Sequence, residues 1–294
     1  MTPTATAELF IDSKCELGEG VFWHPLLDRL FWFDIINKTL FSATANGIMV
    51  DRFLFDAPVS AAGVIDADHL AIASSAGLYR LELSTDTREL MSPIDPPNAA
   101  TRSNDGRVNP AGGFWIGTMG LKEPGRIKSG SLYQIRDGQV TKLLGDINIP
   151  NSTCFSPDGA IAYFADTAAR TIRQVSLDPA TGLPNGPWRD FVGPDHPGGP
   201  DGAAVDSKGY VWNARWGGSC VIRFAPDGKV DRVIEVPVPQ PSCPAFGGPD
   251  LRTLYITTAR ENLTPAQLAA APESGGVFAI DVDVPGLPEN LFRA

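Results

Sequence analysis

Four short segments of the chain each begin with an oxygen-bearing side chain and continue into a turn and an apolar strand. Their first residues are Glu19, Asn104, Asn151 and Asp201. If the segments are structural repeats, these side chains occupy equivalent positions and can converge on one point. Carboxylate and amide oxygens are the ligands of hard divalent cations such as Ca²⁺, Mg²⁺ and Mn²⁺. The pattern therefore predicts a metal site built from repeated units.

Two weaker copies of the same unit begin at Ala61 and Ser242. The six lead positions, 19, 61, 104, 151, 201 and 242, are then separated by 42, 43, 47, 50 and 41 residues. One four-stranded blade of a β-propeller takes about 40–50 residues. The spacing therefore favours six propeller blades.

The sequence between the lead positions is typical of short strands. Apolar and polar residues alternate, and Asp-Gly pairs at 137–138, 158–159 and 227–228 supply the positive φ that hairpin turns need. Helical periodicity is nearly absent, apart from one short helical turn expected at 264–269. We predict an all-β fold, a six-bladed β-propeller that occupies residues 1–294 as a single domain.

A propeller ring must be closed, because an open ring would expose the edges of its sheets. The first complete unit begins only at Glu19, so the extended segment at residues 8–11 is left over. We expect this N-terminal strand to complete the last blade beside the C-terminal strands.

Composition limits the classes of partner. The chain has 294 residues, 43% of them apolar, and a formal charge of −10, which argues against nucleic acid and anionic membranes as partners. No apolar stretch approaches the roughly 20 residues that cross a bilayer, and residues 1–11 contain no secretion signal. We expect a cytoplasmic protein, a monomer or weak dimer. Its cysteines form no Cys-x-x-Cys pair and are expected to be free thiols: Cys15, Cys154, Cys220 and Cys243.

The innermost strand of each propeller blade lines the central channel, so the six lead residues are expected around one of its ends. There the carboxylates of Glu19 and Asp201 would balance a divalent ion. The small residues Ala61 and Ser242 would leave one side open for a ligand. The alternative is that these polar side chains only hold water in a wet channel.

Several ordered motifs between residues 14 and 281 resemble the SMP-30/gluconolactonase (regucalcin-like) family. They are Leu-Gly-Glu-Gly at 17–20, Arg-Ser-Asn-Asp-Gly at 102–106, Trp-Ile-Gly-Thr-Met at 115–119, Pro-Asp-Gly at 200–202, Phe-Gly-Gly at 246–248, Thr-Ala-Arg at 258–260 and Gly-Gly-Val-Phe at 275–278. The resemblance implies a six-bladed propeller that hydrolyses sugar-acid lactones with one bound divalent cation.

By this resemblance, Glu19, Asn151 and Asp201 match the metal ligands of the family. Arg102 and Asn104 match its substrate-contacting residues, and Asn104 is close enough in the pattern to assist the metal as well. The cation is expected to be Ca²⁺ first, with Zn²⁺, Mn²⁺ and Mg²⁺ as alternatives. Animal members carry an acidic residue where this chain has Lys122. Either Lys122 binds a differently arranged substrate, or Glu123 beside it takes the acidic role.

The expected function is metal-dependent hydrolysis of a gluconolactone-like aldonolactone to the open-chain acid. The metal would polarise the lactone carbonyl. Asp201 is assigned as the general base that activates water, and Glu19 is the other candidate. The alternative from another class is a calcium-binding regulatory protein without turnover. A propeller scaffold and an organophosphate- or aryl-ester-cleaving propeller are further alternatives, but Arg102 at the channel mouth favours a sugar lactonase.

Other residue types provide weaker evidence for a functional site. His24 and His69 are expected in structural turns, whereas His196 lies in a loop leading to Asp201 and is a weaker candidate for approaching the substrate. No serine sits on a sharp strand-to-helix turn, and no glycine-rich phosphate loop precedes a helix. Three tryptophans share one position of the repeat and are expected in the core: Trp32, Trp115 and Trp212.

Overall fold

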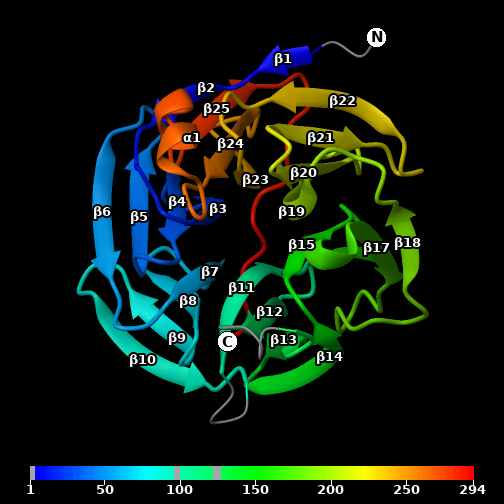
Figure 1. Ribbon diagram of the computed structural model, residues 1–294. Coiled ribbons are helices and arrows are strands. Elements are labelled where there is room, and N and C mark those ends of the chain that lie inside the picture. Colours follow the sequence, from blue (N-terminus) through cyan, green and yellow to red (C-terminus); the bar gives the residue numbers. More distant parts are fainter. Residues whose placement is uncertain (1–3, 96–99, 122–126) are drawn as a thin grey trace.

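The structure, a computed structural model, describes residues 4–95, 100–121 and 127–294. It shows a ring of six sheets around a central channel (Figure 1). In every blade the chain begins with the strand nearest the channel and moves outward by antiparallel pairing. The predicted all-β, six-bladed propeller is confirmed.

The first three blades each contain four consecutive strands. Blade 1 is β3 (Gly18–His24), β4 (Arg29–Asp34), β5 (Thr39–Thr44) and β6 (Met49–Leu54). Blade 2 is β7 (Val59–Val64), β8 (His69–Ser74), β9 (Gly77–Glu82) and β10 (Thr87–Ser92). Blade 3 is β11 (Thr101–Val108), β12 (Phe114–Gly120), β13 (Gly130–Arg136) and β14 (Gln139–Ile147).

The last three blades follow the same plan with small additions. Blade 4 is β15 (Pro150–Phe155), β16 (Ile161–Asp166), the 3₁₀ turn η1 (Thr167–Ala169), β17 (Thr171–Ser176) and β18 (Arg189–Val192). Blade 5 is β19 (Gly199–Val205), β20 (Val211–Trp216), β21 (Cys220–Phe224) and β22 (Val230–Glu235). Blade 6 is β23 (Pro241–Gly247), β24 (Thr253–Thr258), the helix α1 (Pro265–Ala270) and β25 (Val277–Asp281).

The hydrophobic core lies between blades. Among the described residues, six apolar clusters form, and each joins two neighbouring blades. Trp32, Trp115 and Trp212 are fully buried in three of these interfaces, which confirms that they are core residues. Trp212, for example, meets the ring of Phe246 edge-on at a centroid distance of 5.7 Å. Packing between blades therefore fixes the positions of the inner strands.

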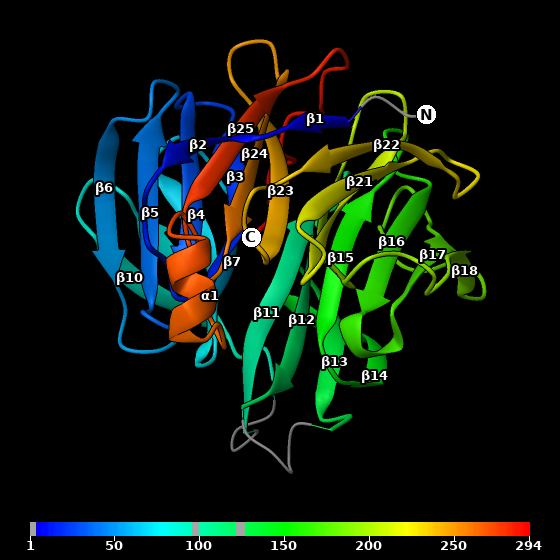
Figure 2. The ribbon, with the colours of Figure 1, turned by 45° about the horizontal axis from the view of Figure 1, so that its top comes forward.

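The N-terminal segment closes the ring. Strand β2 (Glu8–Ile11) pairs antiparallel with β25 as the outermost strand of blade 6, as expected from the sequence (Figure 2). The preceding strand β1 (Thr4–Thr6), which sequence reasoning did not anticipate, pairs in parallel with β22 of blade 5. The N-terminal segment thus ties two adjacent blades together.

The C-terminal segment, residues 282–294, crosses the channel from blade 6 toward blades 2 and 3 (Figure 1). The amide of Phe292 donates to the carbonyl of Val64, and Asn290 Nδ2 donates to the carbonyl of Val108. Both acceptors end inner strands, whereas the lead residues lie near the beginnings of those strands. The segment therefore covers the channel end opposite the predicted site.

The expected helical turn is α1, which Thr264 caps by accepting from the amide of Gln267. No helix in the described ranges is long and apolar enough to cross a membrane.

Deleting residues 1–13 is predicted to lower the melting temperature by about 10 °C or more. The deletion removes the β2–β25 pairing and the buried side chain of Ile11, and a loss of about 5 kcal/mol corresponds to that shift in a domain of this size. Deleting residues 1–6 removes only β1 and should have a smaller effect. Thermal unfolding followed by circular dichroism measures both, and an unchanged midpoint for the longer deletion would contradict closure by β2.

Candidate active site

The innermost strand of every blade is interrupted where its lead residue lies. The register between the first and second strands shifts at Glu19/Phe22, Val59/Ala61, Ser103/Gly106, Asn151/Cys154, Pro200/Ala203 and Pro241/Cys243. An extra residue in one strand bends it and redirects the neighbouring side chains. The repeated bulge lets a lead residue face the channel end.

Two of the bulges contain a residue with a positive backbone dihedral φ. Gly20, next to Glu19, has φ +55°, and a Cβ there would lie 2.2 Å from the carbonyl oxygen of Ser60. Only glycine fits that position. Ser152, next to Asn151, has φ +61° although it is not glycine. Its hydroxyl donates to the carbonyl of Asp201 at 2.6 Å, so the conformation links two lead residues in adjacent blades.

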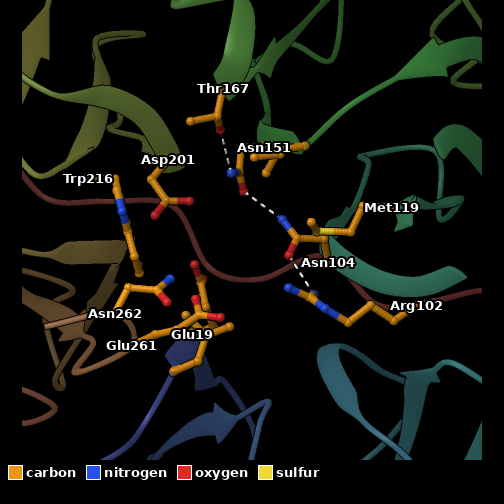
Figure 3. A pocket seen from close by; sticks show the side chains of 12 residues that line it. Glu19, Arg102, Asn104, Met119, Asn151, Thr167, Asp201, Trp216, Glu261 and Asn262 are labelled. Atoms are coloured by element: carbon orange, nitrogen blue, oxygen red, sulfur yellow. Dashed lines mark hydrogen bonds between the residues drawn. The ribbon is translucent and has the colours of Figure 1, made fainter. Parts of the chain in front are cut away.

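Four of the six lead residues line one pocket at this end of the channel (Figure 3). They are Glu19, Asn104, Asn151 and Asp201, and their side chains point toward a common space. Ala61 and Ser242 are not part of the lining. The Ser242 hydroxyl instead donates to the carbonyl of Gly18. The pocket encloses an empty volume of about 520 Å³ including its open mouth, within the size range of small-molecule sites.

Glu19 and Asp201 form a buried carboxyl pair. Their side chains are 6% and 4% exposed, and both line the same pocket. Burial raises the pKa of Glu19 to about 8 and that of Asp201 well above its usual range, and the charge of Glu19 raises the pKa of Asp201 further. Asp105, a third buried carboxyl, adds to the repulsion. The channel end therefore concentrates negative charge that a cation would compensate.

The amide of Asn151 is held in one orientation. Its Nδ2 donates to the Thr167 hydroxyl at 2.7 Å, and that hydroxyl donates onward to the carbonyl of Pro200 at 2.7 Å. Because the hydroxyl proton is used, Thr167 can only accept from Asn151. The Asn151 Oδ1 is thereby turned toward the pocket, as a metal ligand requires (Figure 3).

Asn104 supports its neighbours. Its Nδ2 donates to the carbonyl of Pro150 at 2.9 Å and to Asn151 Oδ1 at 3.2 Å. Its Oδ1 accepts from Arg102 Nη1 at 2.7 Å. Both ends of the amide are thus engaged by protein, and its nitrogen faces Asn151. In this arrangement the Asn104 amide bridges Arg102 and Asn151.

Sequence reasoning missed the group that holds the main chain at Asp201. Asn213 Nδ2 donates to the Asp201 carbonyl at 2.9 Å and to the Ser152 hydroxyl at 3.0 Å. Arg215, fully buried, donates to Asn213 Oδ1 at 2.9 Å. Burial lowers the pKa of Arg215 to about 10, which leaves it charged at neutral pH. Polar residues within the otherwise apolar strand β20 were the signal that could have revealed this support.

The outer wall of the pocket also escaped prediction. It consists of Leu17, Met119, Ile149, Thr167, Trp216, Glu261 and Asn262. Trp216 and Asn262 lie across the pocket from Arg102 and Asn104 (Figure 3). Glu261 and Asn262 directly follow the motif at 258–260. The position of that motif could have indicated that these two residues lie at the pocket.

The histidines do not line the pocket, and two further candidates, Lys122 and its alternative Glu123, lie outside the described residues. His196 is not among the lining residues, and its ring packs edge-on against Phe224 at 5.1 Å. His69 pairs with Asp66 at 2.8 Å, as a structural turn residue would.

The side chains fit a hard divalent cation. Two carboxyl groups and the oriented Oδ1 of Asn151 supply oxygen donors only, which suits Ca²⁺, Mg²⁺ and Mn²⁺. The described residues contain no cluster of three or more His, Cys, Asp or Glu side chains able to hold a metal. The four cysteines are buried free thiols. Any resident cation would thus depend on the mixed carboxylate and amide set.

Comparison with known proteins identifies the family of the chain. Residues 17–260 match the family model described as SMP-30/Gluconolactonase/LRE-like region. A 6-deoxy-6-sulfogluconolactonase of Pseudomonas putida is 36% identical over 98% of both chains, and a pentonolactonase of Haloferax volcanii is 35% identical over 98% of both. The crystal structure of a calcium-binding protein, regucalcin, from Agrobacterium tumefaciens superposes with a TM-score of 0.95 at 38% identity, covering 99% of this chain and 98% of that one. The chain belongs to the SMP-30/gluconolactonase/LRE-like family.

Proposed function

We propose that the protein hydrolyses a sugar-acid lactone of the aldonolactone type to its open-chain acid, with one divalent cation held by Glu19, Asn151 and Asp201. The observation that carries the proposal is the convergence of a buried carboxyl pair and an oriented amide oxygen beside Arg102 in one open pocket. Two relatives named as lactonases support the reaction class.

The cation is proposed to be Ca²⁺, with Zn²⁺, Mn²⁺ and Mg²⁺ as alternatives. When bound, it supplies Lewis-acid polarisation of the lactone carbonyl. The similar structure described as a calcium-binding protein supports Ca²⁺ as the first choice. The chain's own contribution is to hold two carboxylates and one amide oxygen at a common point while the bulges keep their main chain rigid.

Asp201 is proposed as the general base that takes a proton from the attacking water. A carboxylate of raised pKa is a better proton acceptor. Burial is the largest cause of the raised pKa of Asp201, followed by the negative charges of Glu19 and Asp105. The main chain of Asp201 is held by Ser152 and Asn213, which fixes the position of its carboxyl group.

Arg102 is proposed to orient the substrate. Its Nη1 donates to Asn104 Oδ1 at 2.7 Å and to the carbonyl of Ser103 at 2.9 Å, which holds the guanidinium at the pocket wall. The planar fork of an arginine suits the ring and hydroxyl oxygens of a sugar lactone. Asn104, which accepts from Arg102, in turn donates to Asn151 Oδ1. Lys122 is also proposed as a substrate contact.

The alternative function is a calcium-binding regulatory protein without turnover, which the similarity to regucalcin, described as a calcium-binding protein, favours. A cation buffer needs the oxygen ligands but has no use for an arginine at the pocket wall or for an open pocket beside the ligands. Both features are present here, so hydrolysis accounts for more of the site.

Hydrolysis of at least one neutral aldonolactone is predicted in a pH-indicator assay across gluconolactone, xylonolactone, arabinonolactone and galactonolactone. Chelation should reduce the rate about 100-fold or more, and re-addition of one of the four cations should restore it. Cation binding measured by calorimetry without turnover of any lactone, under every cation, would instead support the regulatory alternative.

The substitution Asp201→Asn is predicted to lower kcat by about 100-fold or more, because the amide cannot accept the proton, while part of the cation affinity remains. Steady-state kinetics and calorimetric titration with Ca²⁺ measure the two effects. Asp227→Asn is the matched control, since that carboxylate lies in an exposed hairpin turn. A wild-type kcat in the Asp201 variant would show that this residue is not the base.

A further inference from the structure

The turn that follows β24 is held rigidly against the pocket. The amides of Arg260 and Glu261 both donate to the carbonyl of Glu16, at 3.0 and 2.8 Å. Gln240, a buried side chain, donates from Nε2 to the carbonyl of Glu261 at 2.9 Å. The turn thus has a fixed main chain although its side chains reach an open site.

Two side chains of this turn complete the pocket wall, namely Glu261 and Asn262. Asn262 has φ +60°, a left-handed conformation that asparagine tolerates better than most residues. Figure 3 shows Asn262 and the indole of Trp216 facing Arg102 and Asn104 across the pocket. Within the described part of the chain, the carboxylate of Glu261 has no ion-pair partner. Its acceptor oxygens are therefore available to a ligand.

Among the described lining residues, Glu19, Asp201 and Glu261 are acidic and Arg102 is basic. A divalent ion would offset the charges of Glu19 and Asp201, which leaves Glu261 as the remaining acidic side chain. Among the described lining residues, Arg102 is the one cationic side chain, and it lies beside Asn104, away from Asn262 (Figure 3). A phosphate or sulfonate group near Glu261 would face like charge, which raises the free energy of binding. A hydroxyl group there would find an acceptor.

We infer that Glu261 and Asn262 determine the substrate class, selecting neutral polyhydroxy lactones and excluding lactones with an anionic terminal substituent. The inference rests on the lactonase function proposed above and adds the chemistry of the distal end of the substrate. Glu261 accepts hydrogen bonds from substrate hydroxyls and repels anions. Asn262 offers both a donor and an acceptor, and Trp216 and Leu17 provide apolar surface for the carbon skeleton.

The test compares kcat/KM for gluconolactone, which is neutral, with kcat/KM for 6-phosphogluconolactone and 6-deoxy-6-sulfogluconolactone. The wild-type protein is expected to prefer the neutral lactone. Glu261→Gln keeps the shape of the side chain and removes its charge, so the ratio should move toward the anionic lactones by about tenfold. Glu89→Gln, the same change on the exposed outer strand β10, should leave the ratio unchanged.

A second variant separates hydrogen bonding from charge. Asn262→Gly removes the amide but accepts the positive φ, so the turn keeps its conformation. It should raise KM for gluconolactone by about tenfold with little change in kcat, and it should leave the neutral-to-anionic ratio near the wild-type value.

A binding measurement, which does not require turnover, distinguishes failure of the proposed lactonase function from failure of the role assigned to Glu261. Calorimetric titration with gluconate and 6-phosphogluconate, in the presence of Ca²⁺, gives the ratio of their dissociation constants for each variant. Failure to hydrolyse any lactone would overturn the proposed function alone. An identical ratio in the wild-type, Glu261→Gln and Glu89→Gln proteins would overturn the assignment of Glu261, whether or not the protein is a lactonase.

Discussion

The carboxyl groups of Glu19 and Asp201 are buried together at one end of the channel, and much of the site architecture serves to keep them there. Taking such charges out of water costs several kcal/mol for each ion unless a partner of opposite charge is supplied. Within the described residues, neither carboxyl group forms a salt bridge, and Arg102 and Arg215 donate instead to Asn104 and Asn213. A divalent cation is the compensation that the donor set fits.

The propeller fold holds the two carboxyl groups in place. Each carboxyl belongs to a different blade, and the blades are locked by the apolar clusters between them. The strained backbone at Ser152 is stabilised by its hydrogen bond to the carbonyl of Asp201. At the other end of the channel, Glu289 of the C-terminal segment pairs with Arg107 at 2.7 Å. The candidate site opens at the opposite end of the channel, where Arg102 and Glu261 lie.

The fold was predictable because blade packing repeats in the sequence. Alternating strands, Asp-Gly turns and equivalent tryptophans recur at blade spacing, and closure by residues 8–11 follows from the unused strand. Strand β1 was not predictable, since three residues carry no periodic signal. The C-terminal crossing was missed for the same reason, because it has no repeat. The bulges were not predictable either. Every blade has one in its inner strand, so the bulges do not stand out in the spacing between the lead residues.

Within the site, the lead residues identified the ligand-capable oxygens but not their roles. The orientation of Asn104 depends on the carbonyl of Pro150 in the next blade, which no local pattern reveals. The support from Asn213 and the outer wall at Glu261 depend on contacts between distant segments. Periodic positions were therefore found from sequence, whereas side chains placed by loops or by neighbouring blades required the structure.

Anomalous diffraction from crystals of the protein soaked with Mn²⁺ would show directly whether the carboxyl pair holds a cation. We expect a strong anomalous peak within ligand distance of Glu19, Asn151 and Asp201, with the two carboxyl groups turned toward it. Full soaking that gives no peak at this position would contradict a cation site at the channel end.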